Sequence, residues 1–107
     1  MNALVFGGAG AIGAAACSKL ADDRFTVLTS SRTPGSADLC IDPIADPSTL
    51  TALNDLEPLD AVVWAQGANL NDSAQSVDVA GFGQVIDANV TFIVATLGHL
   101  VSGGLLA

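Results

Sequence analysis

Short apolar runs alternate with helix-like segments along the first third of the chain. Residues 3–6 are apolar and lead into a glycine-rich turn, and the alanine-rich residues 11–20 follow without a helix breaker. This order predicts a strand and then a helix. Residues 25–29 are apolar and β-branched and are followed by Pro34 and Gly35. They are predicted as a second strand that ends in a loop.

The middle of the chain continues this alternation. Residues 39–41 predict a brief third strand, and residues 61–64 are apolar throughout, as is typical of a strand covered on both faces of a parallel sheet. Between them, Asp46 fits an N-cap and Pro47 fits the first helical position, where its missing N–H costs nothing. We therefore expect a short helix after Asp46.

The last third carries the longest predicted helix. Residues 69–77 are polar and predict a loop, after which Asp78 is placed to cap a helix. Apolar side chains recur at helical spacing to about His99, and the glycines at 103 and 104 stop the helix. Residues 105–107 predict the start of a fifth strand. The spaced apolar residues are Ile86, Val90, Ile93, Val94 and Leu97.

Strands that alternate with helices at this spacing pair in parallel, through right-handed crossovers, with helices on both faces. The predicted architecture is therefore a doubly wound α/β sheet, which stops as the fifth strand begins. The 107 residues form one domain, and a compact chain of this length buries roughly two-thirds of its unfolded surface.

Charge and composition exclude some classes of partner. Half of the residues are hydrophobic, and 11 acidic against 3 basic residues give a formal net charge of −8. A chain without a basic surface does not bind nucleic acid. A small anion can still be bound by backbone N–H groups and a single arginine.

Two apolar segments raise the question of a membrane or a secretion signal. The first 17 residues contain four glycines and no basic residue, which disfavours a signal peptide. Residues 88–107 lack charge over a membrane-spanning length, but polar residues and glycines interrupt them, so a buried helix and a strand are favoured.

Cys17 and Cys40 match no redox or metal motif and are expected to be buried, reduced thiols. We expect a cytoplasmic protein without a membrane partner.

Three glycines, Gly7, Gly10 and Gly13, stand at intervals of three directly after the first predicted strand. A turn between a parallel strand and a helix presents unpaired N–H groups and about half a unit of positive charge. Glycines there allow a sharp turn, approach of a pyrophosphate and close packing of helix and strand. The pattern favours a dinucleotide site, while a tight turn without a ligand stays the alternative.

Arg32 follows the second predicted strand, nineteen residues after Gly13. An acidic residue at this place in a dinucleotide fold binds the ribose 2′-hydroxyl, whereas the segment "SSR", residues 30–32, offers two hydroxyls and a guanidinium suited to a 2′-phosphate. NADP is therefore favoured over NAD. The alternative is that Arg32 is an ordinary exposed loop residue.

Five segments, in this order and spacing, resemble the N-terminal half of a short-chain dehydrogenase/reductase: "VFGGAGAIG", "TSSR", "IDP", "DAVVWAQGAN" and "VIDANVTF". The resemblance implies a Rossmann-type fold and an NADP-dependent oxidoreductase that acts on a small carbonyl or alcohol. It also implies a homo-oligomer formed through the long helix near residues 85–100. The implied cofactor-binding residues are Gly7, Gly10, Ala11, Ile12, Gly13, Ser31, Arg32, Asp42, Ala65 and Gly67.

Within this resemblance, Asp42 would face the adenine and Gly67 would end the turn that usually reads NNAG. Asn89 matches the catalytic asparagine that stabilises a kink in the long helix and orders a water of the proton relay. The chain departs from the family pattern at "WAQG", where Trp64 and Gln66 replace small or amide residues.

The residues that perform the family's chemistry are missing. Such enzymes use a tyrosine, a lysine and a serine around hydride transfer, but this chain has no tyrosine, and its one lysine, Lys19, belongs to the first predicted helix. Whether the chain acts as an enzyme is therefore open. The alternatives to the cofactor-binding part of a reductase are a non-catalytic nucleotide-binding or regulatory module and a decayed fragment.

Overall fold

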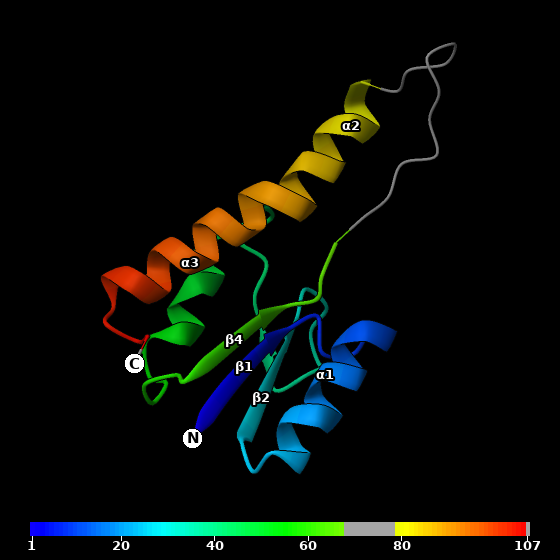
Figure 1. The fold of residues 1–107 in the computed structure, drawn as a ribbon. Coiled ribbons are helices and arrows are strands. Elements are labelled where there is room, and N and C mark those ends of the chain that lie inside the picture. Colours follow the sequence, from blue (N-terminus) through cyan, green and yellow to red (C-terminus); the bar gives the residue numbers. More distant parts are fainter. Residues whose placement is uncertain (68–78, 107) are drawn as a thin grey trace.

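The centre of the molecule is a parallel sheet of four strands in the order β3-β2-β1-β4 (Figure 1). The computed structural model describes residues 1–67 and 79–106. Every pairing in the sheet is parallel, and Phe6 at the end of β1 lies between Ser30 and Trp64. This confirms the doubly wound α/β class. The strands are β1 (Asn2–Phe6), β2 (Thr26–Ser31), β3 (Leu39–Cys40) and β4 (Ala61–Trp64).

Helices cover the two faces of this sheet. Side chains alternate between the faces along a strand, and in β1 the side chains of Leu4 and Phe6 join the hydrophobic core, in which Phe92 and Leu100 of α3 (Phe92–Ser102) also lie. The helix α1 (Ala11–Asp22) contacts β1, β2 and β4 and lies across the sheet from α3 (Figure 1). The core thus holds α3 over the end of β1.

A short helix follows β3, as the sequence predicts. It is the 3₁₀ helix η1 (Pro47–Leu53), capped by Asp46, whose carboxylate accepts hydrogen bonds from the backbone N–H of Ser48 at 3.0 Å and from its hydroxyl at 2.7 Å. These bonds hold the pKa of Asp46 below its ordinary value of 3.8. Leu53 at the end of η1 is fully buried in the core.

The long helix is continuous from Val79 to Ser102 but changes its winding in the middle. A π-helical turn, Asp87–Thr91, joins α2 (Val79–Ile86) to α3. The helix ends three residues beyond the predicted His99, and Gly103 caps it. The apolar spacing predicts one regular helix and does not indicate this π-turn. The predicted loop 69–77 and the cap Asp78 lie outside the described residues.

Two predictions about burial are wrong. The residues of β4 are half-buried rather than covered on both faces, because β4 pairs with β1 along one edge and, in the described ranges, the next strand is marked only by an isolated bridge between Leu59 and Leu106. Cys17 and Cys40 are free thiols, as expected, but both are half-buried.

The segment Val79–Ser102 is long and apolar enough to cross a membrane, and 22% of its most apolar window is buried. In the structure its inner side packs into a globular fold, where Phe92, Thr96 and Leu100 are buried. This packing favours a soluble protein over a membrane-spanning one.

Candidate nucleotide-binding site

The turn between β1 and α1 can only be built with glycine at two of its positions. Gly7 has a φ of +79°, and a Cβ on it would lie 2.7 Å from the backbone nitrogen of Gln66. A Cβ on Gly13 would overlap the carbonyl oxygen of Gly7. Because glycine has no side chain at these positions, the start of α1 can pack closely against the sheet, with the turn at the carboxyl edge of the strands.

The N-terminus of α1 has the features of an anion-binding site. Gly10 is the N-cap residue, no side chain caps the helix, and its first turn contains no acidic residue. The backbone N–H groups of Ala11 and Ile12 therefore have neither a side-chain acceptor nor a neighbouring negative charge to satisfy them. A phosphate group fits this end of the helix.

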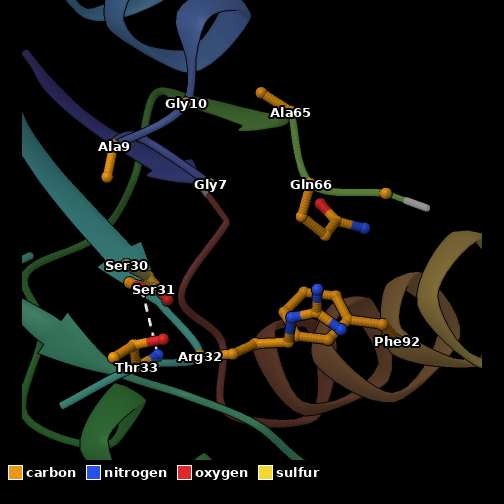
Figure 2. A pocket seen from close by; sticks show the side chains of 11 residues that line it. Gly7, Ala9, Gly10, Ser30, Ser31, Arg32, Thr33, Ala65, Gln66 and Phe92 are labelled. Carbon is orange, nitrogen blue, oxygen red and sulfur yellow. Dashed lines mark hydrogen bonds between the residues drawn. The ribbon is translucent and has the colours of Figure 1, made fainter. Parts of the chain in front are cut away.

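A pocket of about 280 Å³ opens beside this turn (Figure 2). Its walls come from the glycine turn, the end of β2, the segment after β4 and the first residue of α3. Six of the residues expected to bind a cofactor line it: Gly7, Gly10, Ser31, Arg32, Ala65 and Gly67. The remaining lining residues are Ala9, Ser30, Thr33, Gln66 and Phe92.

Arg32 is the charged residue of this pocket. Its side chain is exposed and extends across the pocket toward the side where Phe92 lies (Figure 2). Within the described ranges Arg32 takes part in no salt bridge. The hydroxyl of Ser31 accepts a hydrogen bond from the backbone N–H of Thr33 at 3.0 Å, which turns the chain at the end of β2 and presents the guanidinium to the pocket.

The other four residues expected to bind a cofactor are not among the residues that line the pocket. Ala11, Ile12 and Gly13 form the first turn of α1, where Ile12 is 77% exposed and Gly13 is buried. Asp42 follows β3, and its carboxylate accepts a hydrogen bond from the backbone of Ala45 at 3.3 Å.

Asn89 lies in the π-turn of the long helix. A Cβ on Gly67 would stand 2.6 Å from the side-chain oxygen of Asn89, so the asparagine is in direct contact with the segment after β4. It contacts the back of the pocket wall.

Of the five lining residues that were not expected to bind a cofactor, Gln66 and Phe92 bring the largest side chains into the wall. Gln66 was noted only as a departure from the usual turn, and Phe92 belongs to the apolar pattern of the long helix. Phe92 is 2% exposed and packs edge-on against Phe6, with ring centroids 5.6 Å apart. A polar residue two positions after an apolar strand of a parallel sheet is the signal that could have indicated Gln66.

The described lining of this pocket is suited to holding an anion. Among the described residues that line it, only Arg32 carries a charge, and arginine does not give up its proton in proteins. Nowhere in residues 1–67 and 79–106 do three His, Cys, Asp or Glu side chains gather as a metal site. The pocket can bind an anion and a flat apolar group beside it.

Comparison with known proteins identifies the fold. No protein-family model matches the sequence, and no curated protein matches it. The solved structures that match are mostly short-chain dehydrogenases/reductases. The protein lin1944 from Listeria innocua superposes with a TM-score of 0.80 at 19% identity, over 96% of this chain and 50% of that one.

Two further structures extend the comparison. An oxidoreductase of the short-chain dehydrogenase/reductase family from Burkholderia thailandensis gives a TM-score of 0.77 at 21% identity, over 95% of this chain and 45% of that one. UDP-glucose-4-epimerase from Stenotrophomonas maltophila, solved with bound NAD and formylated UDP-arabinopyranose, gives 0.68 at 28% identity, over 98% and 34%. The chain has the Rossmann-type fold of these proteins and spans half of their length or less.

Proposed function

We propose that this chain binds NADP and forms the cofactor-binding part of an oxidoreductase of the short-chain dehydrogenase/reductase type. One observation carries the proposal: the uncapped N-terminus of α1 and the guanidinium of Arg32 border the same pocket at the carboxyl edge of the sheet. In open α/β sheets this edge is where nucleotides bind. The bound NAD of the epimerase with a similar fold supports the choice of a nicotinamide dinucleotide.

The residues around the pocket suit the parts of a dinucleotide. The diphosphate would accept hydrogen bonds from the backbone N–H groups of Ala11 and Ile12 at the start of α1. Ser31 and Arg32 would hold the 2′-phosphate, because a guanidinium binds phosphate in a bidentate manner. Asp42 would stand near the adenine, and Ala65 and Gly67 would form the opposite wall.

When bound, the cofactor would donate a hydride to a small carbonyl compound or, in its oxidised form, accept one from the corresponding alcohol. This chain's own contribution is to bind and orient the nucleotide. By resemblance, Asn89 would stabilise the kink of the long helix and position a water for the proton relay, a role its place in the π-turn supports.

Titration with NADPH tests the proposal. Nicotinamide fluorescence and quenching of the single tryptophan, Trp64, both report binding, since the segment after Trp64 lines the pocket. We expect saturation at micromolar to sub-millimolar NADPH and weaker binding of NADH. Failure of both signals to saturate at millimolar NADPH would refute the proposal.

A second candidate is a nucleotide-binding or regulatory module without catalysis. The observation in its favour is the absence of a proton donor among the described residues of the pocket, in a sequence that contains no tyrosine. The DNA downstream of residue 107 distinguishes the two candidates. An in-frame continuation with a Tyr-x-x-x-Lys spacing supports the reductase, and its absence supports the module.

We also propose that the chain self-associates through an apolar stripe on the outside of the long helix. The stripe carries no charge, so two copies can meet there without bringing like charges together despite the net charge of −8. The two free thiols agree with a reducing cytoplasm as the location. The stripe consists of the exposed residues Val79, Phe82, Ile86, Val90, Val94, Leu97 and Val101.

A further inference from the structure

In the wall of the pocket, only one of the two polar groups of the Gln66 carboxamide makes a hydrogen bond to the described residues. Its amide nitrogen donates a hydrogen bond to the carbonyl oxygen of Ala88 in the π-turn, at 3.2 Å. Its carbonyl oxygen Oε1 is buried and accepts no hydrogen bond from the residues that the structure describes. Figure 2 shows the carboxamide on the side of the pocket toward which the side chain of Arg32 extends.

The orientation of this carboxamide follows from its partner. Exchanging the nitrogen and oxygen of Gln66 would set its oxygen against the carbonyl oxygen of Ala88, where neither group can donate. The oxygen is therefore the group without a partner. Buried polar atoms in this condition are rare in folded proteins and unfavourable, and they commonly mark a place where a ligand completes the site.

We propose that Gln66 recognises the nucleotide, its carboxamide oxygen accepting a hydrogen bond from an exocyclic N–H group of one of the two bases. This inference rests on the proposed function. The bond to Ala88, at 3.2 Å, is at the long end of the ordinary range, and the carboxamide would turn toward the pocket to present its oxygen when a donor enters. Two groups of the dinucleotide offer this chemistry, the amino group of adenine and the carboxamide of nicotinamide.

Two cofactor analogues distinguish these donors. The hypoxanthine analogue of NADP lacks the adenine amino group, and the 3-acetylpyridine analogue lacks the nicotinamide N–H. Competition against NADPH fluorescence gives the ratio of the Kd of each analogue to the Kd of NADP. For the unaltered chain we expect one analogue to bind about 3- to 10-fold more weakly than NADP, as the loss of one hydrogen bond predicts.

Gln66→Met keeps the length of the side chain and removes the acceptor, so the raised ratio should fall to about one. Gln66→Ala serves the same purpose if Gln66→Met does not fold, which circular dichroism checks. Gln84→Met, on the exposed part of α2 outside the pocket, should keep the ratio of the unaltered chain.

The outcomes distinguish a failure of the proposed role of Gln66 from a failure of the proposed NADP binding. A ratio unchanged by removal of Gln66, or two analogues that bind the unaltered chain as tightly as NADP, would overturn this inference and leave the proposed function intact. An unaltered chain that binds no NADP at all would overturn both.

Discussion

The indole nitrogen of Trp64 donates a hydrogen bond of 2.9 Å to the hydroxyl of Thr96, 32 residues later in the chain. This hydroxyl in turn donates to the carbonyl oxygen of Phe92 at 2.8 Å, and Thr96 is completely buried. The indole also stacks on Phe6, with ring centroids 5.5 Å apart. The end of β4 and the start of α3 are thereby fixed to each other at the floor of the pocket.

Thr96→Val tests this connection. Valine has nearly the same shape but leaves the indole N–H of Trp64 buried without an acceptor, which destabilises a protein by about 1–3 kcal/mol. We expect a loss of this size in the free energy of unfolding measured with urea. Thr96→Ser, which retains the hydroxyl, should lose less than half as much. A Thr96→Val variant as stable as the unaltered chain would show that this hydrogen bond does not stabilise the contact.

Gly13→Ala is expected to prevent the correct fold of the β1–α1 turn. The new methyl group would overlap the carbonyl oxygen of Gly7, and backbone at this position cannot move without separating α1 from the sheet. Thermal melts should show a large loss of stability or no cooperative transition. The control is Gly98→Ala in α3, where a Cβ meets no neighbouring atom. There alanine should stabilise the helix by up to about 1 kcal/mol. A stable Gly13→Ala variant would contradict the close approach.

Arg32→Ala should reduce the affinity for NADPH by about 10- to 100-fold and leave that for NADH within about twofold. A charge-assisted hydrogen bond to phosphate contributes about 1.5–3 kcal/mol, and only NADPH carries the 2′-phosphate. Fluorescence titration with both nucleotides gives the two Kd values. Arg24→Gln, which removes the same charge from a residue that does not line the pocket, should preserve the preference. An equal loss for both nucleotides would refute the role of Arg32.

Much of this fold follows from local patterns. The strand 61–64 and the N-cap at Asp46 are confirmed because apolar runs and capping residues act over a few positions. The π-turn and the half-buried state of β4 depend on contacts between distant residues, such as Gln66 with Ala88. No local spacing encodes these contacts. The glycine turn is a local pattern, so the sequence could indicate the pocket beside it. Phe92 reaches the pocket through tertiary packing, which the sequence does not reveal.

Acid should weaken the cap of η1. Hydrogen bonds from the hydroxyl and then from the backbone N–H of Ser48 lower the pKa of Asp46 from its ordinary value of 3.8. A carboxyl whose pKa is depressed by folding adds stability at pH values above its unfolded pKa, and this contribution disappears as the pH falls through the folded pKa. Comparison with Asp46→Asn, which caps without titrating, isolates the effect. The stability difference between the two proteins should be constant above pH 5 and should change below pH 4. A difference that stays constant down to pH 2 would contradict the assignment.

Val94→Glu should convert a self-associated chain to a monomer. Val94 is 65% exposed at the middle of the apolar stripe, and in an interface that two copies share, one substitution introduces the charge twice. Burying two carboxylates without partners costs more than the apolar contact supplies. Light scattering at matched concentrations should therefore show a lower mass for this variant. Gln84→Glu adds the same charge on the same helix but, by helical spacing, away from the stripe, and it should leave the mass unchanged. If the unaltered chain is itself monomeric at high concentration, or if both variants dissociate alike, the stripe is not the interface between copies.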